Sequence, residues 1–296
     1  MWIEAFVEYL RCEKNSSEHT VVSCRSDLTE FESYMKSLDE QLTWANVDRD
    51  VVRQWVVDKM ERGYSPSTVC RNLSSLRSFY KFLLRCKYVD KDPTLGIQGP
   101  KKPKLLPQFV RETDMDRLLD GNYFPDTLEG LRDKLVVLTF YSTGIRLAEL
   151  VSLSWLDVDL ASGMLKVTGK RNKQRIVPFG EELRRAFEEY RRKLAEQGEP
   201  ADDACPVFIN LSKGCRISRG KVTAIVRLYL SQVTTLKKRS PHVLRHSFAT
   251  SMLNHNADLQ SVKELLGHER ITTTEIYTHT TFEELKKMYN QAHPRA

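Results

Sequence analysis

The chain has 296 residues, of which 41% are hydrophobic and 29% charged, and this ordinary balance excludes a collagen-like or wholly disordered protein. Its 46 lysines and arginines exceed its 39 aspartates and glutamates, and the formal net charge of +7 suits a polyanionic partner. The apolar runs fall far short of the ~20 residues that span a bilayer. With no secretory signal pattern and six scattered cysteines without a C-x-x-C pair, the sequence predicts a cytoplasmic protein with no membrane association.

Four amphipathic helices are expected in the first third of the chain. Apolar residues recur at helical spacing in four segments, bounded by capping or stopping residues such as Asp48 or Asp50, Ser65 and Gly63. The segments are residues 2–10, 18–38, 48–60 and 65–86. They predict a small helical bundle, which forms a domain over residues 1–96.

Residues 97–108 predict a basic linker between two domains. Glycine and proline break any helix here, and the lysines favour an extended, exposed path. Lys101, Lys102 and Lys104 also form a candidate strap along DNA, because contacts to phosphates release condensed counterions. A linker that is basic only for solubility would have the same composition.

The second domain is expected over residues 109–296. It begins with a helix capped by Thr113, followed by a buried helix over about residues 131–142. Apolar and polar residues alternate over residues 155–179, which predicts a three-stranded antiparallel sheet with a strongly basic turn at 169–173. Helices are expected again over residues 181–197, 218–230, 241–255, 259–266 and from 282 to the tail. The predicted fold class is mainly α with a small antiparallel sheet: a four-helix bundle followed by a mixed α+β domain.

Two predicted helix starts carry side chains that can bind an anion. Arg146 follows a glycine turn, where free N–H groups favour negative charge, and Glu149 lies on the same side of the helix. Alone, these two would be an ordinary surface ion pair. His242 and Arg245 share a helix face and can reach one oxyanion together. His242 and His246 have the spacing of a zinc pair, but a valine replaces the glutamate of the H-E-x-x-H motif, so no metal site is predicted.

Further candidates lie in the basic turn and near the C-terminus. The turn supplies Lys170, Arg171 and Lys173, which are close rivals in sequence. His268 directly follows a helix-stopping glycine, where the helix dipole favours a cation. Tyr277 follows nine residues later, and a lone tyrosine of this kind usually belongs to the core.

Taken in chain order, these side chains resemble a known signature. An arginine, a hairpin lysine, His-x-x-Arg, Gly-His and a tyrosine match the tyrosine recombinases, the lambda-integrase-type site-specific recombinases. The stretches Thr-Gly-Ile-Arg-Leu-Ala-Glu-Leu, His-Val-Leu-Arg-His-Ser-Phe-Ala-Thr and Leu-Leu-Gly-His are close to the family's usual wording. The resemblance covers essentially the whole chain, since the N-terminal bundle is similar to the family's core-binding domain. Within the family, the chain is most similar to bacterial Xer recombinases.

The resemblance implies a reaction and its main participants. Tyr277 is expected to attack a DNA phosphodiester, which forms a 3′-phosphotyrosyl bond and releases a 5′-hydroxyl. Arg146 and Arg245 would clamp the nonbridging oxygens with forked donors, and Lys170 would protonate the leaving oxygen. Because the covalent bond conserves the phosphodiester energy, no cofactor is expected. No metal is expected either, because cationic side chains take over the role that a divalent ion plays in many nucleases.

The resemblance also implies supporting roles. His242 would assist proton transfer with Tyr277, His268 would hydrogen-bond the phosphate, and Glu149 would hold His242 or Arg146 in place. Basic residues of both domains are candidates for DNA binding. These are Arg71, Arg77, Lys101, Lys102, Lys104, Arg171, Lys173 and Arg219.

The implied partners are double-stranded DNA with a specific recombination site and a tetramer of recombinases on two such sites, formed with itself or with a homologous recombinase. A FtsK-type DNA translocase is a further candidate. Phe282, Leu285, Met288 and Tyr289 form an apolar helical face with no evident place on the same chain. The C-terminal helix over residues 282–290 is therefore expected to dock onto a neighbouring recombinase in trans.

The expected function is Xer-type resolution of chromosome or plasmid dimers. An integrase or excisionase of a phage or mobile element would use the same two domains. A type IB topoisomerase-like enzyme would use the same chemistry without strand exchange. A DNA-binding accessory protein without activity is a fourth reading, against which the intact set of six catalytic side chains argues.

Overall fold

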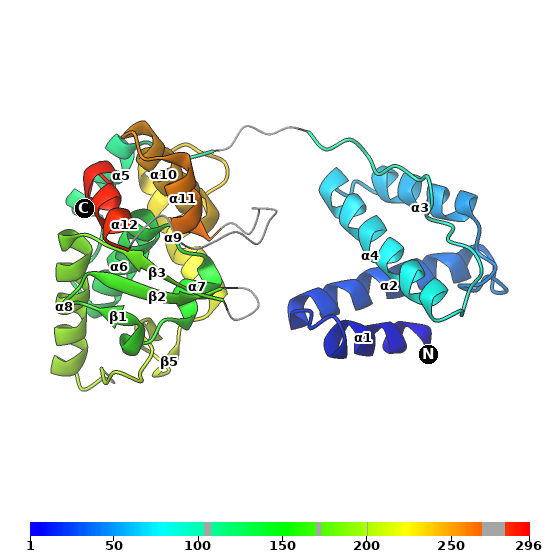
Figure 1. Ribbon diagram of the computed structural model, residues 1–296, viewed down its shortest axis with the longest axis horizontal. Helices are drawn as coiled ribbons and strands as arrows, with labels where there is room; N and C mark the ends of the chain where they lie inside the picture. The colour runs from blue at the N-terminus through cyan, green and yellow to red at the C-terminus, as the bar shows by residue number, and fades with distance from the viewer. Residues whose placement is uncertain (104–107, 170–172, 200, 268–281) are drawn as a thin grey trace. The chain divides into compact units, whose positions relative to one another are not determined.

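The computed structural model describes residues 1–103, 108–169, 173–199, 201–267 and 282–296 (Figure 1). The chain divides into two compact units, Met1–Leu105 and Leu106–Ala296, which are treated separately below. In the described ranges, no helix combines the length and the apolar character needed to cross a membrane.

The N-terminal unit is a bundle of four helices. They are α1 (Trp2–Cys12), α2 (Glu18–Leu38), α3 (Arg49–Glu61) and α4 (Pro66–Arg85). Side-chain oxygens of Ser17, Asp48 and Ser65 each accept a hydrogen bond from the backbone N–H three residues later, which satisfies a free donor at each helix start. The core between the helices is rich in aromatic rings, among them the fully buried Phe31 and Trp55 in edge-to-face contact.

Two ion pairs lie partly or wholly inside this bundle. Lys59 is completely buried, and its Nζ lies 2.6 Å from Glu30 Oε2 and 3.2 Å from Asn72 Oδ1. Asp27 is 4% exposed, and its two oxygens lie 2.7 and 2.6 Å from Nη1 of Arg71. Each charge in the bundle interior therefore has one opposite charge and further hydrogen bonds, as buried ions require.

The C-terminal unit surrounds the long helix α6 (Leu128–Thr143), which is buried on nearly all sides. It packs against α8 (Glu181–Glu196), α9 (Arg219–Val233) and α10 (Pro241–Asn254). The remaining helices are α5 (Glu112–Asp120), α7 (Leu147–Ser152), the short 3-10 helix η1 (Trp155–Asp157), α11 (Leu259–Leu266) and α12 (Phe282–Ala292).

A three-stranded antiparallel sheet adjoins these helices. Its strands are β1 (Val158–Asp159), β2 (Met164–Thr168) and β3 (Gln174–Pro178), in that order. The register pairs Val167 with Arg175 and Thr168 with Gln174, so β2 and β3 run together to the base of the basic turn. The sheet and the predominance of helices confirm the predicted fold class.

Two details differ from the prediction. The first helix of this unit is capped by Arg111 and begins at Glu112, not at a cap on Thr113. Contacts with α10 determine this start, because Val110 N donates to Ser247 Oγ (2.8 Å) and Ser251 Oγ donates to Glu112 Oε1 (2.8 Å). A second hairpin, β4 (Ile209–Asn210) with β5 (Cys215–Arg216), was not predicted, because two-residue strands carry no alternation that a pattern could detect.

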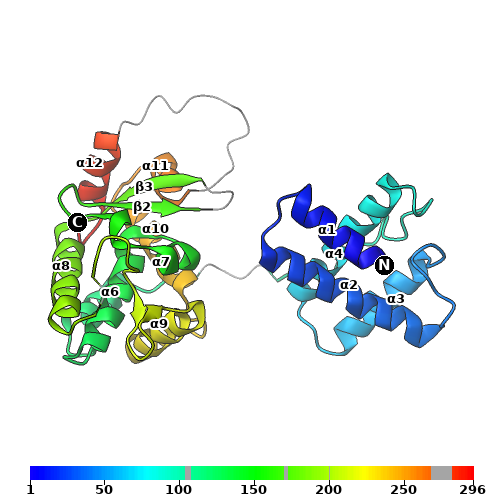
Figure 2. The same ribbon diagram turned by 90° about the horizontal axis from the view of Figure 1, so that it is seen from below.

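The C-terminal helix has a place on its own chain, and the expectation that it lacks one is wrong. Tyr289 is fully buried and clusters with Phe248 of α10 and Leu265 of α11, and Figure 2 shows α12 against this part of the unit. The buried His293 stacks on Tyr289, and burial lowers the pKa of this imidazole to about 4. Arg295 completes the attachment through ion pairs with acidic side chains of α5 and α8.

Candidate functional site

The turn between α6 and α7 forms the floor of the candidate site. Gly144 has φ +59°, and a Cβ there would lie 2.4 Å from Phe248 Cδ1, so only glycine fits. Arg146 follows as the N-cap of α7. The Glu149 carboxylate accepts hydrogen bonds from the backbone N of Arg146 (2.7 Å) and from its Nη1 (2.8 Å). The cap thus fixes both the backbone and the guanidinium of Arg146.

A second guanidinium reaches Glu149 from the sheet. Arg175 of β3 donates from Nη1 and Nη2 to the two Glu149 oxygens, at 2.8 and 2.9 Å. Glu149 is only 1% exposed. Burial alone would raise the pKa of this carboxyl, but the hydrogen bonds from Arg175 and Arg146 outweigh it and lower the pKa to about 2. Glu149 is therefore ionised at any physiological pH.

The third guanidinium is that of Arg245, which is 7% exposed on α10. Its Nη1 donates to Gly144 O and its Nη2 to Leu266 O, both at 2.6 Å. Burial, together with the nearby charges of Arg146 and Arg175, lowers the pKa of Arg245 to about 10. Arg245 is thus a charged group in a poorly solvated position beside two other cations.

The end of α11 brings the three arginines together. Leu265 O accepts from Arg175 Nε (2.9 Å), Leu266 O accepts from Arg245 Nη2, and Gly267 O accepts from Arg146 Nη2 (2.7 Å). Three consecutive carbonyls, which a helix leaves without partners at its C-terminal end, each receive one guanidinium. The negative end of the helix dipole favours the same arrangement.

The site therefore carries more positive than negative charge. Among the described residues, Arg146 and Arg175 pair with Glu149 and Arg245 lies nearby, so guanidiniums outnumber carboxylates in this cluster. The Arg146 side chain is 34% exposed and that of Arg175 is 16% exposed, so the cluster is open to solvent through Arg146. Forked guanidinium donors at such a place suit a phosphate with two nonbridging oxygens.

Two histidines lie beside Arg245 on α10. His242 precedes Arg245 by one turn, and its Nε2 lies 3.0 Å from Nε2 of His246, so one nitrogen donates and the other accepts. In the described part of the chain, no group of three or more His, Cys, Asp or Glu side chains is arranged to hold a metal ion.

Comparison with known proteins decides the family. A model described as the phage integrase family matches residues 108–284, and one described as the phage integrase N-terminal SAM-like domain matches residues 3–87. The chain is a tyrosine recombinase of the phage integrase family. This finding confirms the family that the motifs predicted, and with it the class of reaction, the cleavage and rejoining of DNA.

The recombinase has relatives named XerC and XerD that match it over nearly their full length. It is 41% identical to the tyrosine recombinase XerC of Halalkalibacterium halodurans, with 100% of this chain and 98% of the relative covered. It is 38% identical to XerC of Pelotomaculum thermopropionicum and to XerD of Oceanobacillus iheyensis, each with 99% of this chain and 98% of the relative covered. The recombinase is therefore Xer-like.

Solved structures share its fold. The integrase of transposon Tn1549, in complex with transposon right end DNA, superposes with a TM-score of 0.73 at 18% identity, covering 98% of each chain. The XerH recombinase bound to difH substrate superposes with a TM-score of 0.69 at 21% identity, covering 96% of this chain and 82% of XerH.

Several predicted site residues lie outside the described ranges. They are Lys104, Lys170, Arg171, His268 and Tyr277. The described residues next to Lys170 and His268 lie at the arginine cluster: a Cβ on Gly169 would be 3.4 Å from Glu149 Oε1, and Gly267 O accepts from Arg146. Of the predicted catalytic set, the described residues bring together Arg146, Arg245 and Glu149, with His242 one helical turn from Arg245.

The predicted DNA-binding residues differ in how they are held. Arg71 is tied to Asp27, and a terminal nitrogen of Arg77 donates to Ile97 O, so both side chains have partners within their own unit. Arg71 is nevertheless exposed, as are the other described candidates, Lys101, Lys102, Lys173 and Arg219. A role in DNA binding stays a prediction for all of them.

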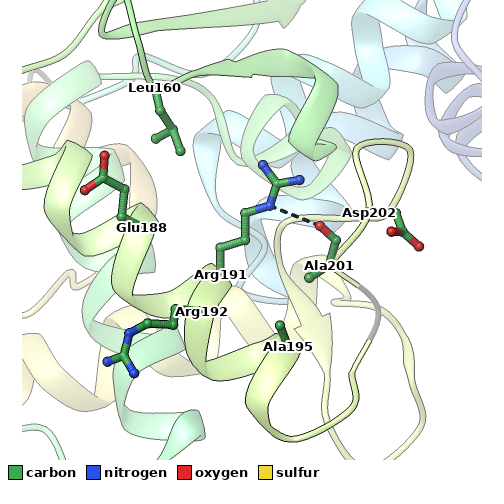
Figure 3. A pocket seen from close by; sticks show the side chains of 7 residues that line it. All are labelled: Leu160, Glu188, Arg191, Arg192, Ala195, Ala201 and Asp202. Atoms are coloured by element: carbon green, nitrogen blue, oxygen red, sulfur yellow. Dashed lines mark hydrogen bonds between the residues drawn. The ribbon is translucent and has the colours of Figure 1, made fainter.

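A separate pocket lies beside α8, away from the arginine cluster (Figure 3). Its lining includes Arg191, whose Nε donates to Ala201 O at 3.1 Å, and the exposed side chain of Arg192. None of the predicted site residues lines it.

Arg175 was not among the predicted site residues. In the sequence it belongs to the strand that leaves the basic turn, and an arginine in an alternating strand gives no sign of its partner. The available signal was weak: a long cationic side chain five residues after Lys170, in a strand otherwise rich in apolar residues.

Proposed function

We propose that the recombinase holds the scissile phosphate between Arg146 and Arg245 and cleaves DNA with Tyr277, in an Xer-type resolution of chromosome or plasmid dimers. The excess of positive charge among the described residues around Glu149 is the observation that carries this proposal, because a diester phosphate brings a negative charge to it. The relatives named XerC and XerD support the biological role.

The proposed reaction is a pair of transesterifications. The Tyr277 oxygen attacks phosphorus, the bond to the 5′-oxygen breaks, and Lys170 donates a proton to that leaving oxygen. His242 takes up the phenolic proton, and His268 donates a hydrogen bond to a nonbridging oxygen. Reversal by the 5′-hydroxyl of another strand rejoins the DNA and regenerates the tyrosine. Arg146 and Arg245 stabilise the charge that builds up on phosphorus-bound oxygens in both steps.

The two units have separate tasks in this proposal. Residues 1–96 form the core-binding domain on double-stranded DNA, residues 97–108 are a basic linker, and residues 109–296 are catalytic. The match of the N-terminal unit to the SAM-like integrase domain supports the first assignment. The structure of XerH with difH gives a precedent for an Xer recombinase on a specific site.

Recombination further requires an assembly of recombinases on two DNA sites, formed with itself or with a homologue. We propose that α12 takes part in it by leaving the surface formed by α10 and α11 and docking in the same way on a neighbour. A helix that buries Tyr289 on its own chain can bury it on an identical surface in trans. A FtsK-type translocase would act on this assembly.

The test of the nucleophile is the substitution Tyr277→Phe. The DNA is a nicked duplex with the sequence that the wild-type protein selects from random duplexes, since the nick lets the 5′-hydroxyl fragment escape and the covalent complex accumulate. Wild type should give a covalent band on a denaturing gel, and Tyr277→Phe should bind the duplex equally well without giving that band. Tyr88→Phe, a change at an exposed tyrosine of the N-terminal unit, is the matched control and should cleave like wild type. A covalent band from Tyr277→Phe would refute the assignment.

A further inference from the structure

The contacts of Arg175 indicate a role for a residue that the proposed reaction does not include. This inference rests on the proposed function. Arg175 lies on β3, opposite Val167 of β2. Its guanidinium reaches two other elements at once: both oxygens of Glu149 on α7 and the carbonyl of Leu265 at the end of α11.

These bonds engage all three nitrogens of the Arg175 guanidinium. The parallel pair of bonds to Glu149 fixes the plane of the carboxylate, and the Nε bond to Leu265 fixes the guanidinium relative to α11. The packing is close, because a Cβ on Gly267 would lie 3.2 Å from Cδ and 3.2 Å from Nη1 of Arg175. A lysine has one ammonium on a flexible stem and cannot make the three bonds in this geometry.

Glu149 in turn holds Arg146, through its backbone N and its Nη1. The Arg146 side chain is the more exposed of the two arginines on Glu149, at 34% against 16% for Arg175. Arg146 is therefore the one that meets a phosphate, and Arg175 acts on it through the shared carboxylate.

We propose that Arg175 is a positioning residue, which locks Glu149 and the last turn of α11 so that Arg146 and Arg245 face the same phosphate. Without Arg175, the Glu149 carboxylate keeps its bonds to Arg146 but loses the two bonds from the Arg175 guanidinium. The end of α11 also loses one of the three arginines that join its consecutive carbonyls to α7, β3 and α10. The positions of Arg146 and Arg245 relative to each other are then no longer fixed.

The test is Arg175→Lys, which keeps the charge and removes the geometry. At saturating protein, the rate constant for covalent complex formation on the nicked duplex should fall about 10–100-fold, as for other residues that orient a reacting group from outside. The dissociation constant for the duplex should change little. If the lysine variant does not fold, Arg175→Gln, which keeps one amide donor, takes its place with the same expectations.

The matched control is Arg216→Lys. Arg216 is also partly buried and also donates to backbone carbonyls of the α7 region, those of Val151 and Leu153, both at 2.8 Å, but it does not touch Glu149. Its change should lower the melting temperature and leave the cleavage rate constant unaltered. Equal losses of rate in Arg216→Lys and Arg175→Lys would overturn the inference, because general support of α7 would then explain both.

A double-mutant cycle distinguishes this role from a purely structural one, because a purely structural role would not make the rate losses of the two substitutions depend on each other. If Arg175 acts through Arg146, Arg175→Lys should cost much less in an Arg146→Lys background than in wild type. Additive losses would overturn the inference, as would an unaltered rate in Arg175→Lys beside a wild type that cleaves. A wild type that forms no covalent complex would instead overturn the proposed function and this inference with it.

Discussion

The two units of the recombinase treat buried charge in different ways. In the N-terminal bundle, Lys59 meets Glu30 and Asp27 meets Arg71, so the charges balance pair by pair. In the C-terminal unit, Glu149 pairs with two arginines beside a third, so positive charge exceeds negative charge among the described residues of this cluster.

The balanced charges of the bundle support the fold, whereas the unbalanced charges of the arginine cluster indicate a site for a charged ligand. A balanced buried pair is complete within the chain, and an apolar pair of the same volume can often replace it. In the arginine cluster, burial and then the neighbouring Arg146 and Arg175 lower the pKa of Arg245, and a bound anion would offset this excess of positive charge. If this distinction holds, the loss of cleavage rate should be largest for a change at Arg245, smaller at Glu149 and smallest at Lys59.

The largest effect is expected from Arg245→Ala. Removing one preorganised cationic donor from the phosphate should lower the rate constant of covalent complex formation by about 10²–10³. Rapid-quench sampling of the nicked duplex at saturating protein measures it. Arg184→Ala, which removes an exposed ion pair with Glu181 on α8, should leave the rate unaltered. A full rate from Arg245→Ala would mean that the positive surplus has no part in cleavage.

Glu149→Gln should lower the cleavage rate less than Arg245→Ala does. It should also change how the stability of the fold depends on pH. The pKa of Glu149 falls from 4.5 to about 2 on folding, so its ionised form stabilises the fold above pH 4.5. That stabilisation, on the order of 3 kcal/mol, is lost as the pH falls from 4.5 toward 2. Wild type should therefore lose more stability than Glu149→Gln over this range, measured by urea unfolding at each pH.

Glu181→Gln is the matched control for this experiment. Glu181 also pairs with arginines, but its carboxylate is exposed on α8, where solvent screens the interaction. Its change should leave the acid unfolding profile close to that of wild type. Parallel profiles for wild type and Glu149→Gln would contradict the role assigned to the buried carboxylate.

The smallest effect on the cleavage rate is expected from Lys59→Met in the N-terminal bundle. Methionine fills a similar volume beside Trp55 and Glu30 can turn to solvent, but the buried Asn72 Oδ1 loses its donor, so the free energy of unfolding should fall by about 1–3 kcal/mol. Thermal unfolding followed by tryptophan fluorescence measures this change, and the cleavage rate should match wild type. A large loss of cleavage here would break the distinction between the two units.

The sequence predicted the parts of this protein that depend on near neighbours along the chain. The caps at Asp48 and Ser65, the strand alternation before Gly169 and the pairing of Arg146 with Glu149 all follow from local spacing. The start of α5 at Glu112 did not, because its partners Ser247 and Ser251 lie on α10, more than a hundred residues away.

The sequence by itself determined the helices, the hairpin with its basic turn, the family and the residue types of the reaction, because each is written in short motifs. Only the tertiary structure decided that Arg146, Arg175 and Arg245 meet at three consecutive carbonyls of α11. It also decided that Tyr289 is buried against its own chain. The reason is physical: these contacts join segments far apart in sequence, and they exist only once α6 and its neighbours have packed.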